Sequence, residues 1–487
     1  MPATSLPPEP PLETSLSIQF NRATRVKQAG KQSAQFASNL DSGPSIRHLP
    51  NGLTIIAEQM PTDVVNLGLW LNVGSRVEAD AINGMAHFLE HMIFKGTPLI
   101  NQGEFERQVE ARGAKMNAAT SQDYTHFYIT SAPKDFTELA PLQVELVMNP
   151  SIEDAHFERE KPVILEEIRR AEDSPARRAF YRSMHMSFDK LPYRRSVLGP
   201  LDVIENLNAE QMRAFHHTWY QPQNMTAVVV GNLPVEGMIA TVEESFEQAI
   251  ANRQNRTDPK LEQQLKQQLE QQVPSTAPEA PFPSVHRQTY VDNALQQAKL
   301  IMSWRVPGMR SIEETYPLDV VAYILGQGRT ARLVNDLREQ QQLVSSISAR
   351  NMTYGNQGVF YISATISTEI ATTEETESKL AVTEDEILRH VTRLHNQLVD
   401  SKELNRVKTQ VANRYIFASE TPSDRAGIYG YHHALTGDVR HALNYPEAIR
   451  QVSAEDVQLA VSQYLPLKAF GVMRLKPSVT DIADVAD

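Results

Sequence analysis

The sequence predicts an α+β protein built from two tandem homologous α/β-sandwich halves joined by a linker. Residues 204–211 resemble residues 449–456, and the Tyr-x-Pro at 220–222 recurs at 464–466, which indicates an internal duplication. Between the copies, residues 252–284 change from a Gln-rich to a Pro- and Ala-rich composition, as is typical of linkers. Each half mixes helical and strand-like patterns, which favours helices packed on antiparallel-type sheets.

Composition shifts also give the expected domain boundaries. Residues 1–45 are rich in Pro, Ser and Gln and are expected to form a flexible extension. The N-terminal domain is expected at 46–250, a polar helix and linker at 251–285, the C-terminal domain at 286–478 and a tail at 479–487. The polar helix rests on apolar residues four apart in a Gln-rich background, at Leu261, Leu265, Leu269 and Val273. The alternative, a surface loop within one domain, does not explain the repeat.

Local patterns then predict the elements of the first half. Asn51-Gly52 is a hairpin-type turn between two short strands, and the alternating apolar residues of 67–73 predict a strand. The remaining expected elements are, in order, helices at 84–94 and 105–111, strands at 114–120 and 124–130, helices at 134–148 and 152–178, and a buried strand at 225–232. In the second half, the strand expected at 298–306 resembles the 67–73 region.

The overall composition excludes several classes of function. The chain has 487 residues, a formal net charge of −12 and no cysteine, so thiolate metal sites, disulfides and cysteine nucleophiles are absent. The acidic balance, without a basic cluster, argues against a nucleic-acid surface. No apolar run approaches the roughly 18 residues of a membrane span. A faintly basic stretch at 22–31 is outweighed as a targeting signal by Glu9, Glu13 and the prolines, so we expect a cytoplasmic protein.

One short motif carries the candidate chemistry, within an apolar helical segment. His87 and His91 are four residues apart and therefore project from the same face of a helix, as two ligands of one metal ion must. Glu90 lies on the same side, which gives the order H-x-x-E-H, the inverse of H-E-x-x-H. The alternative is a pair of structural histidines beside a solvated glutamate, and only a third ligand separates the two interpretations.

The second half lacks the equivalent motif. When Trp70 is aligned with Trp304, the three motif residues fall on Val321, Ile324 and Leu325. These side chains cannot bind a metal ion, so the second copy is expected to keep the helix for packing alone. The duplication therefore predicts one half with a metal site and one half without.

The segment from His87 to Thr97 resembles the signature of the M16 (pitrilysin-type) metallopeptidases, an inverted-zincin family. It is closest to the branch that contains the mitochondrial processing peptidase and its bacterial relatives. The resemblance covers about residues 45–478 and continues through residues 113–118, 198–199, 220–225, 231–232, 332–333 and 337–339. It implies a clam-shell fold and a zinc-dependent endopeptidase that cleaves peptides or unfolded segments inside a closed chamber.

The resemblance also implies roles for individual residues around Zn²⁺. The third ligand falls on Glu167, although Glu166 lies beside it. Two imidazoles and one carboxylate suit Zn²⁺ and leave a position open. Glu90 is expected to be the general base and Glu160, two turns before Glu167, to support the site without binding the metal. The alternative for Glu160 is a solvated helix carboxylate.

Three further residues are implied in substrate binding. Asn117 and Ala118 are expected to hold the backbone of a peptide substrate added as an extra strand, although an ordinary core strand would have the same sequence. Active relatives also supply an arginine and a tyrosine seven residues apart from the second half. Arg338 occupies the first position, but Ser345 stands at the second.

This departure predicts the form of the assembly. A serine cannot reach where a phenol would stabilise the oxyanion. We therefore expect the zinc-bearing, catalytic subunit of a heterodimer, whose related M16 partner supplies the Arg/Tyr pair; a homodimer is the less favoured arrangement. The alternative function is a non-catalytic scaffold or peptide-binding subunit of an M16-like assembly. Intact His87, Glu90, His91 and Glu167 favour the enzyme.

Overall fold

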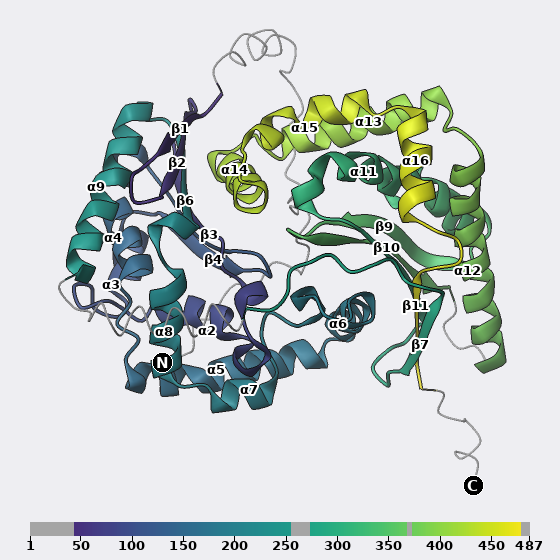
Figure 1. The fold of residues 1–487 in the computed structure, drawn as a ribbon, viewed down its shortest axis with the longest axis horizontal. Helices are drawn as coiled ribbons and strands as arrows, with labels where there is room; N and C mark the ends of the chain where they lie inside the picture. Colours follow the sequence, from purple (N-terminus) through teal and green to yellow (C-terminus); the bar gives the residue numbers. More distant parts are fainter. Residues whose placement is uncertain (1–42, 255–272, 368–372, 479–487) are drawn as a thin grey trace.

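Two β-sheets, one in each half of the chain, organise the computed structural model, which describes residues 43–254, 273–367 and 373–478 (Figure 1). The first sheet has the strand order β1-β2-β6-β3-β5-β4, and the second has the order β7-β11-β8-β10-β9. The expected extension at 1–45, except its last three residues, most of the polar helix and the tail from 479 lie outside the described residues. The strands are β1 (Ser45–His48), β2 (Thr54–Gln59), β3 (Val65–Leu71), β4 (Lys115–Thr120), β5 (Thr125–Ser131), β6 (Met225–Gly231), β7 (His286–Val291), β8 (Lys299–Pro307), β9 (Val344–Met352), β10 (Gln357–Ile366) and β11 (Gly471–Lys476).

The two sheets repeat one topology. Strands β2-β6-β3-β5-β4 of the first correspond in order to β7-β11-β8-β10-β9 of the second. In each sheet the first of these pairs is parallel and the next three are antiparallel. The α+β fold with two homologous halves is therefore confirmed.

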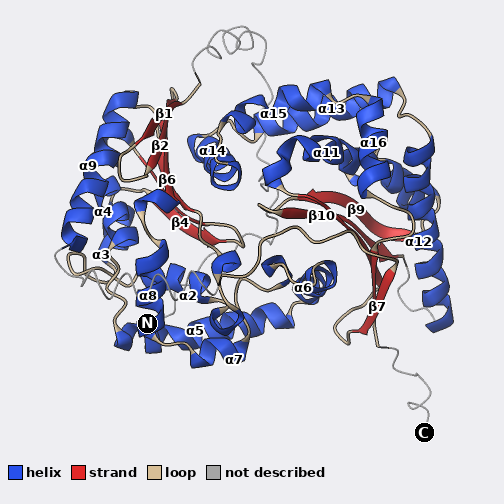
Figure 2. Cartoon of the chain, in the orientation of Figure 1, coloured by secondary structure: helices blue, strands red, loops and turns tan. Residues whose placement is uncertain are grey.

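Helices cover both sheets, as Figure 2 shows in blue against the red strands. In the described part of the chain, none of them is both long and apolar enough to cross a membrane. The α-helices are α2 (Met85–Ile93), α3 (Glu104–Ala111), α4 (Phe136–Met148), α5 (Asp154–Asp173), α6 (Pro175–Ser187), α7 (Leu201–Asn206), α8 (Ala209–Trp219), α9 (Val235–Gln254), α11 (Ile312–Gly326), α12 (Thr373–Asn396), α13 (Ser401–Phe417), α14 (Pro422–Thr436), α15 (Arg440–Gln451) and α16 (Ala454–Tyr464). A π-helical segment, η7, spans Val334–Gln340.

The two halves exchange one helix each. Helix α14 of the second half packs on β3 and β6 of the first sheet, while α6 of the first half packs on β8 and β11 of the second. Figure 1 shows both helices between the two sheets. Each sheet therefore has one face covered by helices of its own half and the other by a helix of the opposite half.

The exchange explains why β3 is buried on both faces. Leu67, Leu69 and Leu71 belong to the core of the first half. Trp70 points to the opposite face and belongs to the core that the second half builds around α11, α13 and α14. In a sheet with one solvent-facing side, Trp70 would be exposed. Because α14 covers that side, Trp70 is only 4% exposed.

Polar contacts also join the halves. On α14, Arg425 pairs with Glu58 of β2 at 2.7 Å, and the hydroxyl of Tyr429 donates a hydrogen bond to the same carboxylate at 2.6 Å. At a second point the backbone N–H of Gly355 donates to buried Asp123 at 2.8 Å. The two halves therefore form one continuous packed structure.

The single helix expected at 152–178 is wrong, because the chain breaks at Ser174. Helix α5 ends at Asp173 and α6 begins at Pro175. A residue before proline is disfavoured in the helical region, and Ser174 has a ψ of 113°. Its hydroxyl accepts a hydrogen bond from the N–H of Arg177, so it caps α6. The break lets α5 stay with the first half while α6 crosses to the second.

Candidate metal centre

Helix α2 carries the motif, and a buried carboxylate outside the helix fixes its N-terminus. Glu78 accepts hydrogen bonds from the backbone N–H groups of Gly84 at 2.9 Å and Ala86 at 2.7 Å. These are donors that the first turn of a helix leaves without partners. The chain begins α2 after Gly84, which has a φ of +100°, and a Cβ there would lie 2.5 Å from the carbonyl oxygen of Leu198. Only glycine fits this position.

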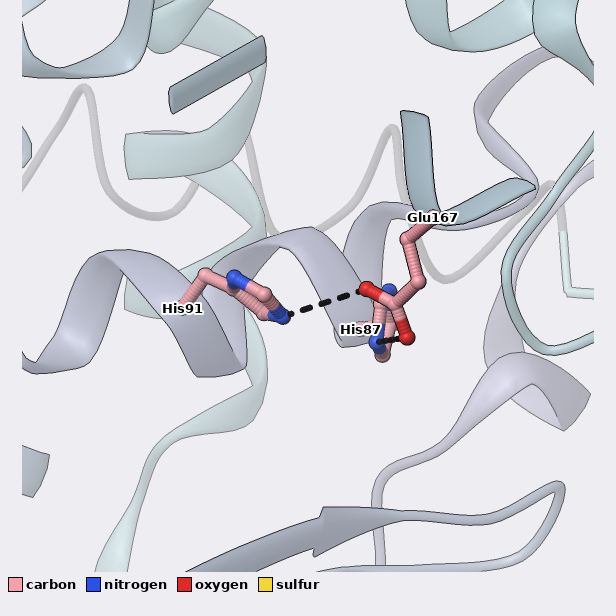
Figure 3. Close-up of side chains that lie close together, drawn as sticks. All are labelled: His87, His91 and Glu167. Carbon is pink, nitrogen blue, oxygen red and sulfur yellow. Dashed lines mark ion pairs between the residues drawn. The ribbon is translucent and has the colours of Figure 1, made fainter. Parts of the chain in front are cut away.

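Helices α2 and α5 bring the three predicted ligands together (Figure 3). The Nε2 atom of His87 lies 3.6 Å from Oε1 of Glu167, and Nε2 of His91 lies 3.6 Å from Oε2 of the same carboxylate. One ligand atom from each of the three residues lies within 4.8 Å of the others. His87 is buried, whereas His91 and Glu167 are half-buried.

This donor set fits a zinc ion. Donors about 2.1 Å from a tetrahedral Zn²⁺ lie about 3.4 Å from one another. The two 3.6 Å separations are close to that value, so little movement is needed to enclose an ion. Glu166, the alternative beside Glu167, is exposed and pairs with Arg170 at 3.3 Å. The helix thus directs Glu167 to the histidines and Glu166 to solvent.

Glu160 lies behind His91 on the same helix as Glu167. Its Oε1 is 3.1 Å from Nδ1 of His91, and its Oε2 is 2.7 Å from Nζ of Lys95. Burial by itself raises the pKa of Glu160, but hydrogen bonds from His91 and Lys95 outweigh it and hold the pKa below its ordinary value. The carboxylate therefore stays ionised, orients the imidazole and leaves Nε2 of His91 facing Glu167.

Glu90 lies one residue before His91 and contacts the end of β4. The hydroxyl of Thr120 donates a hydrogen bond to Oε2 of Glu90 at 2.5 Å. Glu90 is half-buried, and it is near enough to the phenol of buried Tyr220 to help raise that pKa, after burial itself. The hydrogen bond from Thr120 therefore holds the Glu90 carboxylate in place, so it is not a freely solvated side chain.

The structure places the expected substrate residues in two separate regions. Asn117 and Ala118 lie on β4, the edge strand of the first sheet, where Asn117 is exposed. Arg338 lies on η7 of the second half, where it pairs with Glu339 at 2.5 Å. Ser345 is exposed on β9 and its hydroxyl contacts Gln297 and the carbonyl of Thr365, both at 3.3 Å.

The alignment of Trp70 with Trp304, which set Val321, Ile324 and Leu325 against the motif, is not matched by the sheets: Trp70 faces α14 of the other half, whereas Trp304 faces the core of its own half. Val321, Ile324 and Leu325 are each 0% exposed and belong to the core of the second half. A second group that could in principle hold a cation, Asp336 with Glu386 and His390, occurs among the described residues. The guanidinium of Arg389 pairs with Asp336 at 2.5 Å and with Glu386 at 2.6 Å. This group of carboxylates therefore already has a cationic partner from the protein.

Three residues around the centre were not anticipated. Lys95 lies two residues past the end of α2 and pairs with Glu160 of α5, a contact that no local pattern indicates. Thr120 lies three residues after Asn117 at the end of a predicted strand, but nothing local connects it with Glu90. Glu78 precedes the helix by a turn of irregular chain, and no capping motif identifies it.

The fold and the residue group together define a class, a mixed α/β protein with two histidines and one glutamate placed so that they could hold a metal ion. Two family models match successive parts of the chain: "Insulinase (Peptidase family M16)" at residues 53–201 and "Peptidase M16 inactive domain" at residues 206–411. The chain belongs to the M16 peptidase family. The inactive-domain model covers a stretch that contains none of His87, His91 and Glu167.

Individual relatives agree with this assignment. An uncharacterized zinc protease of Rickettsia bellii is 25% identical over 414 residues, which is 85% of this chain and 93% of the relative. A protease from Helicobacter pylori has a similar structure, with a TM-score of 0.78, 23% identity and coverage of 89% of this chain and 99% of that one. The periplasmic protease PqqL from Escherichia coli gives a TM-score of 0.70 at 18% identity, covering 90% of this chain and 48% of its own.

Proposed function

We propose that the protein is a zinc-dependent endopeptidase, with His87, His91 and Glu167 as the metal ligands. The observation that carries this proposal is the convergence of these three side chains from α2 and α5, with Glu90 beside them. A bound Zn²⁺ would supply Lewis acidity at this point. The names of the relatives, which include zinc proteases, support the same activity.

Proton transfer is assigned to Glu90. Its carboxylate would accept the proton of the attacking water and deliver it to the leaving amine of the cleaved peptide bond. The hydrogen bond from Thr120 fixes one oxygen of Glu90 and restricts the carboxylate to a position next to His91 in the chain. Glu160 acts through His91, because it contacts the imidazole nitrogen that does not face Glu167.

The substrate would lie along β4. This strand is the edge of the first sheet and ends at Thr120, which contacts Glu90, so a peptide added alongside it would pass the candidate centre. Backbone hydrogen bonds at Asn117 and Ala118 would hold the peptide with little demand on its sequence. An extended or unfolded segment is therefore the expected substrate, enclosed in a chamber formed with a second subunit.

The second subunit is proposed to be a related M16 chain that supplies an Arg/Tyr pair. In this chain Arg338 is paired with Glu339, and Ser345 has too short a side chain for the tyrosine's role. The alternative function, a non-catalytic scaffold or peptide-binding subunit, is favoured by the match to an inactive-domain model. That match covers residues 206–411, which contain none of the three ligand residues, and this is why we place the enzyme first.

Metal content and cleavage separate these functions. The purified protein is expected to hold close to one zinc ion per chain, measured by elemental mass spectrometry. Glu167→Gln should lose zinc, whereas its neighbour Glu166→Gln, which is exposed, should keep it. Glu90→Gln should keep zinc and lose cleavage of a labelled peptide. A wild-type protein without zinc would favour the scaffold, and full cleavage by Glu90→Gln would refute its role as the base.

The cellular compartment is a further part of the proposal and rests on the sequence. The sequence favours the cytoplasm, whereas the similar structure of PqqL is described as that of a periplasmic protease. Fractionation of cells that produce the protein, with a blot for the chain, distinguishes the two.

A further inference from the structure

The second half contains a cavity in the region that corresponds to the metal centre of the first half. Its volume is about 220 Å³, and it lies among α11, β9, α13, α14 and α15. Helix α11 follows β8 as α2 follows β3, β9 is the edge strand that corresponds to β4, and α13 precedes the exchanged α14 as α5 precedes α6. The duplication has therefore kept a hollow here, although the zinc ligands are absent.

A carboxyl group on α11 lines this cavity. Asp319 accepts hydrogen bonds from Nδ2 of Asn351 and from the hydroxyl of Tyr445, both at 2.8 Å, and it remains half-buried. Burial raises its pKa to about 6, and these two hydrogen bonds oppose the rise. A carboxylate in such a site gains from a cationic partner, because it has lost much of its water.

Two polar atoms of the lining have no hydrogen-bond partner among the described residues. They are Nδ1 of His432 and Oδ1 of Asn351, on side chains that are 3% and 8% exposed. A buried polar atom without a partner costs about 1–3 kcal/mol. Both residues line the cavity, so its wall is polar as well as aromatic.

The lining also contains aromatic and basic side chains, among aliphatic and neutral polar ones. Tyr415 stacks on Tyr445 with ring centroids 4.5 Å apart, and Tyr323 and Tyr431 also line the cavity. Arg414 is exposed and Arg350 is half-buried, so guanidinium groups lie toward the solvent side. Arg414 donates a hydrogen bond to Tyr323, whose pKa burial raises and Arg414 lowers.

We propose that this cavity binds a small zwitterion with an apolar side chain, a free hydrophobic amino acid or a dipeptide. Asp319 would hold the ammonium group, Arg414 and Arg350 the carboxylate, and the tyrosines the side chain. Ligand pockets usually span about 300–1,000 Å³, and a cavity of about 220 Å³ suits a ligand at the small end of that range. This site would be separate from the proposed peptidase centre and does not depend on that activity.

Three probes test the proposal by calorimetry on the full-length chain: L-phenylalanine, L-phenylalaninamide, which lacks the carboxylate, and N-acetyl-L-phenylalanine, which lacks the ammonium group. Phenylalanine should bind, and each blocked probe should bind at least about tenfold more weakly because one charged contact is lost. Binding should persist in His91→Gln, which separates the cavity from the metal centre. Failure of phenylalanine to bind at millimolar concentration would overturn the proposal.

Two variants of the lining locate the site. Ala322→Leu fills the cavity with an apolar group and should abolish binding of phenylalanine. Arg414→Gln, at an exposed position that is expected to fold normally, should weaken phenylalanine about tenfold but leave phenylalaninamide unchanged. The matched control is Arg406→Gln on the same helix, where Arg406 contacts Thr330 outside the cavity. Equal binding of phenylalanine by wild type and both lining variants would contradict the assignment.

Discussion

At the residue scale, carboxylates outside the three predicted metal ligands carry much of the organisation. Glu160 holds His91 and Lys95, Glu78 holds the first turn of α2, and Asp319 lines the cavity of the second half. Their environments differ. Cationic and imidazole partners lower the pKa of Glu160, whereas burial raises that of Glu78 and Asp319. Equivalent substitutions should therefore have different consequences.

Replacing Glu160 tests its action through His91. Glu160→Gln should reduce zinc affinity by about 10- to 100-fold, the usual effect of losing a partner of a metal-binding histidine. The reason is that the amide no longer fixes the imidazole by a charge-assisted hydrogen bond. Competition with a chelator measures this. Glu158→Gln, exposed on the same helix and paired with Lys161, is the control and should bind zinc as the wild type does. Equal zinc affinities of Glu160→Gln and the wild type would show that Glu160 does not support the metal ligands.

Asp319 should make stability depend on pH. Its pKa is about 6 in the folded protein against an ordinary 3.8, so the folded state holds the proton more tightly. The resulting stabilisation is complete below the ordinary pKa and is lost as the pH rises through 6, a change of up to about 3 kcal/mol. The melting temperature of the wild type, relative to that of Asp319→Asn, should therefore decrease as the pH rises from 4 to 7.

The control for this titration is Asp438→Asn. A hydrogen bond from Arg440 holds the pKa of Asp438 at about 2, so this carboxylate stays ionised over the same range. The difference in melting temperature between Asp438→Asn and the wild type should therefore stay nearly constant from pH 4 to 7. A flat difference for Asp319→Asn as well would contradict the raised pKa.

At the element scale, the exchanged helix α14 depends on a close approach to the first sheet. A Cβ at Gly430 would lie 2.0 Å from Nε1 of Trp70, which belongs to a rigid, buried ring. Gly430→Ala should destabilise the protein by about 1–3 kcal/mol despite the better helix propensity of alanine. Thermal unfolding followed by circular dichroism measures the change.

Gly427 on the same helix provides the matched comparison. A Cβ there meets nothing within 4 Å. Gly427→Ala should therefore stabilise the protein by about 0.5–1 kcal/mol through helix propensity alone. If both substitutions raise the melting temperature, the contact between α14 and β3 is looser than the structure shows.

The same elements show what the sequence could predict. Local periodicity and turn residues identify β3, α2 and the hairpin of β4 and β5, because these signals depend on nearby residues. The relation of Glu167 to the histidines required a family resemblance, since the two helices meet only in the fold. The exchange of α6 and α14 could not be inferred, because periodicity does not state which sheet a helix covers. The role of Glu78 at the N-terminus of α2 could not be inferred either, because its position in the sequence matches no known capping motif.

At the scale of the whole molecule, the chain contains a candidate set of metal ligands in one half and a cavity with different chemistry in the other. The contacts of Glu58 with Arg425 and Tyr429 tie the halves together, so one half does not move without the other at that point. Completion of the peptidase centre is therefore proposed to come from a second chain.

The purified chain is expected to be weakly active, and a co-purified M16 partner with an Arg/Tyr pair to raise peptide cleavage by about 100- to 1,000-fold, the usual value of one oxyanion donor. Side-by-side assays of the chain and the native complex measure this.

Ser345→Tyr offers a second route, because Ser345 is exposed on β9 and a larger side chain is tolerated there. If the chain acts as a homodimer, this variant should raise its activity; if only the related partner completes the centre, it should not. Full cleavage by the pure wild-type chain would remove the need for a partner, and the oxyanion contact would then have to come from another residue.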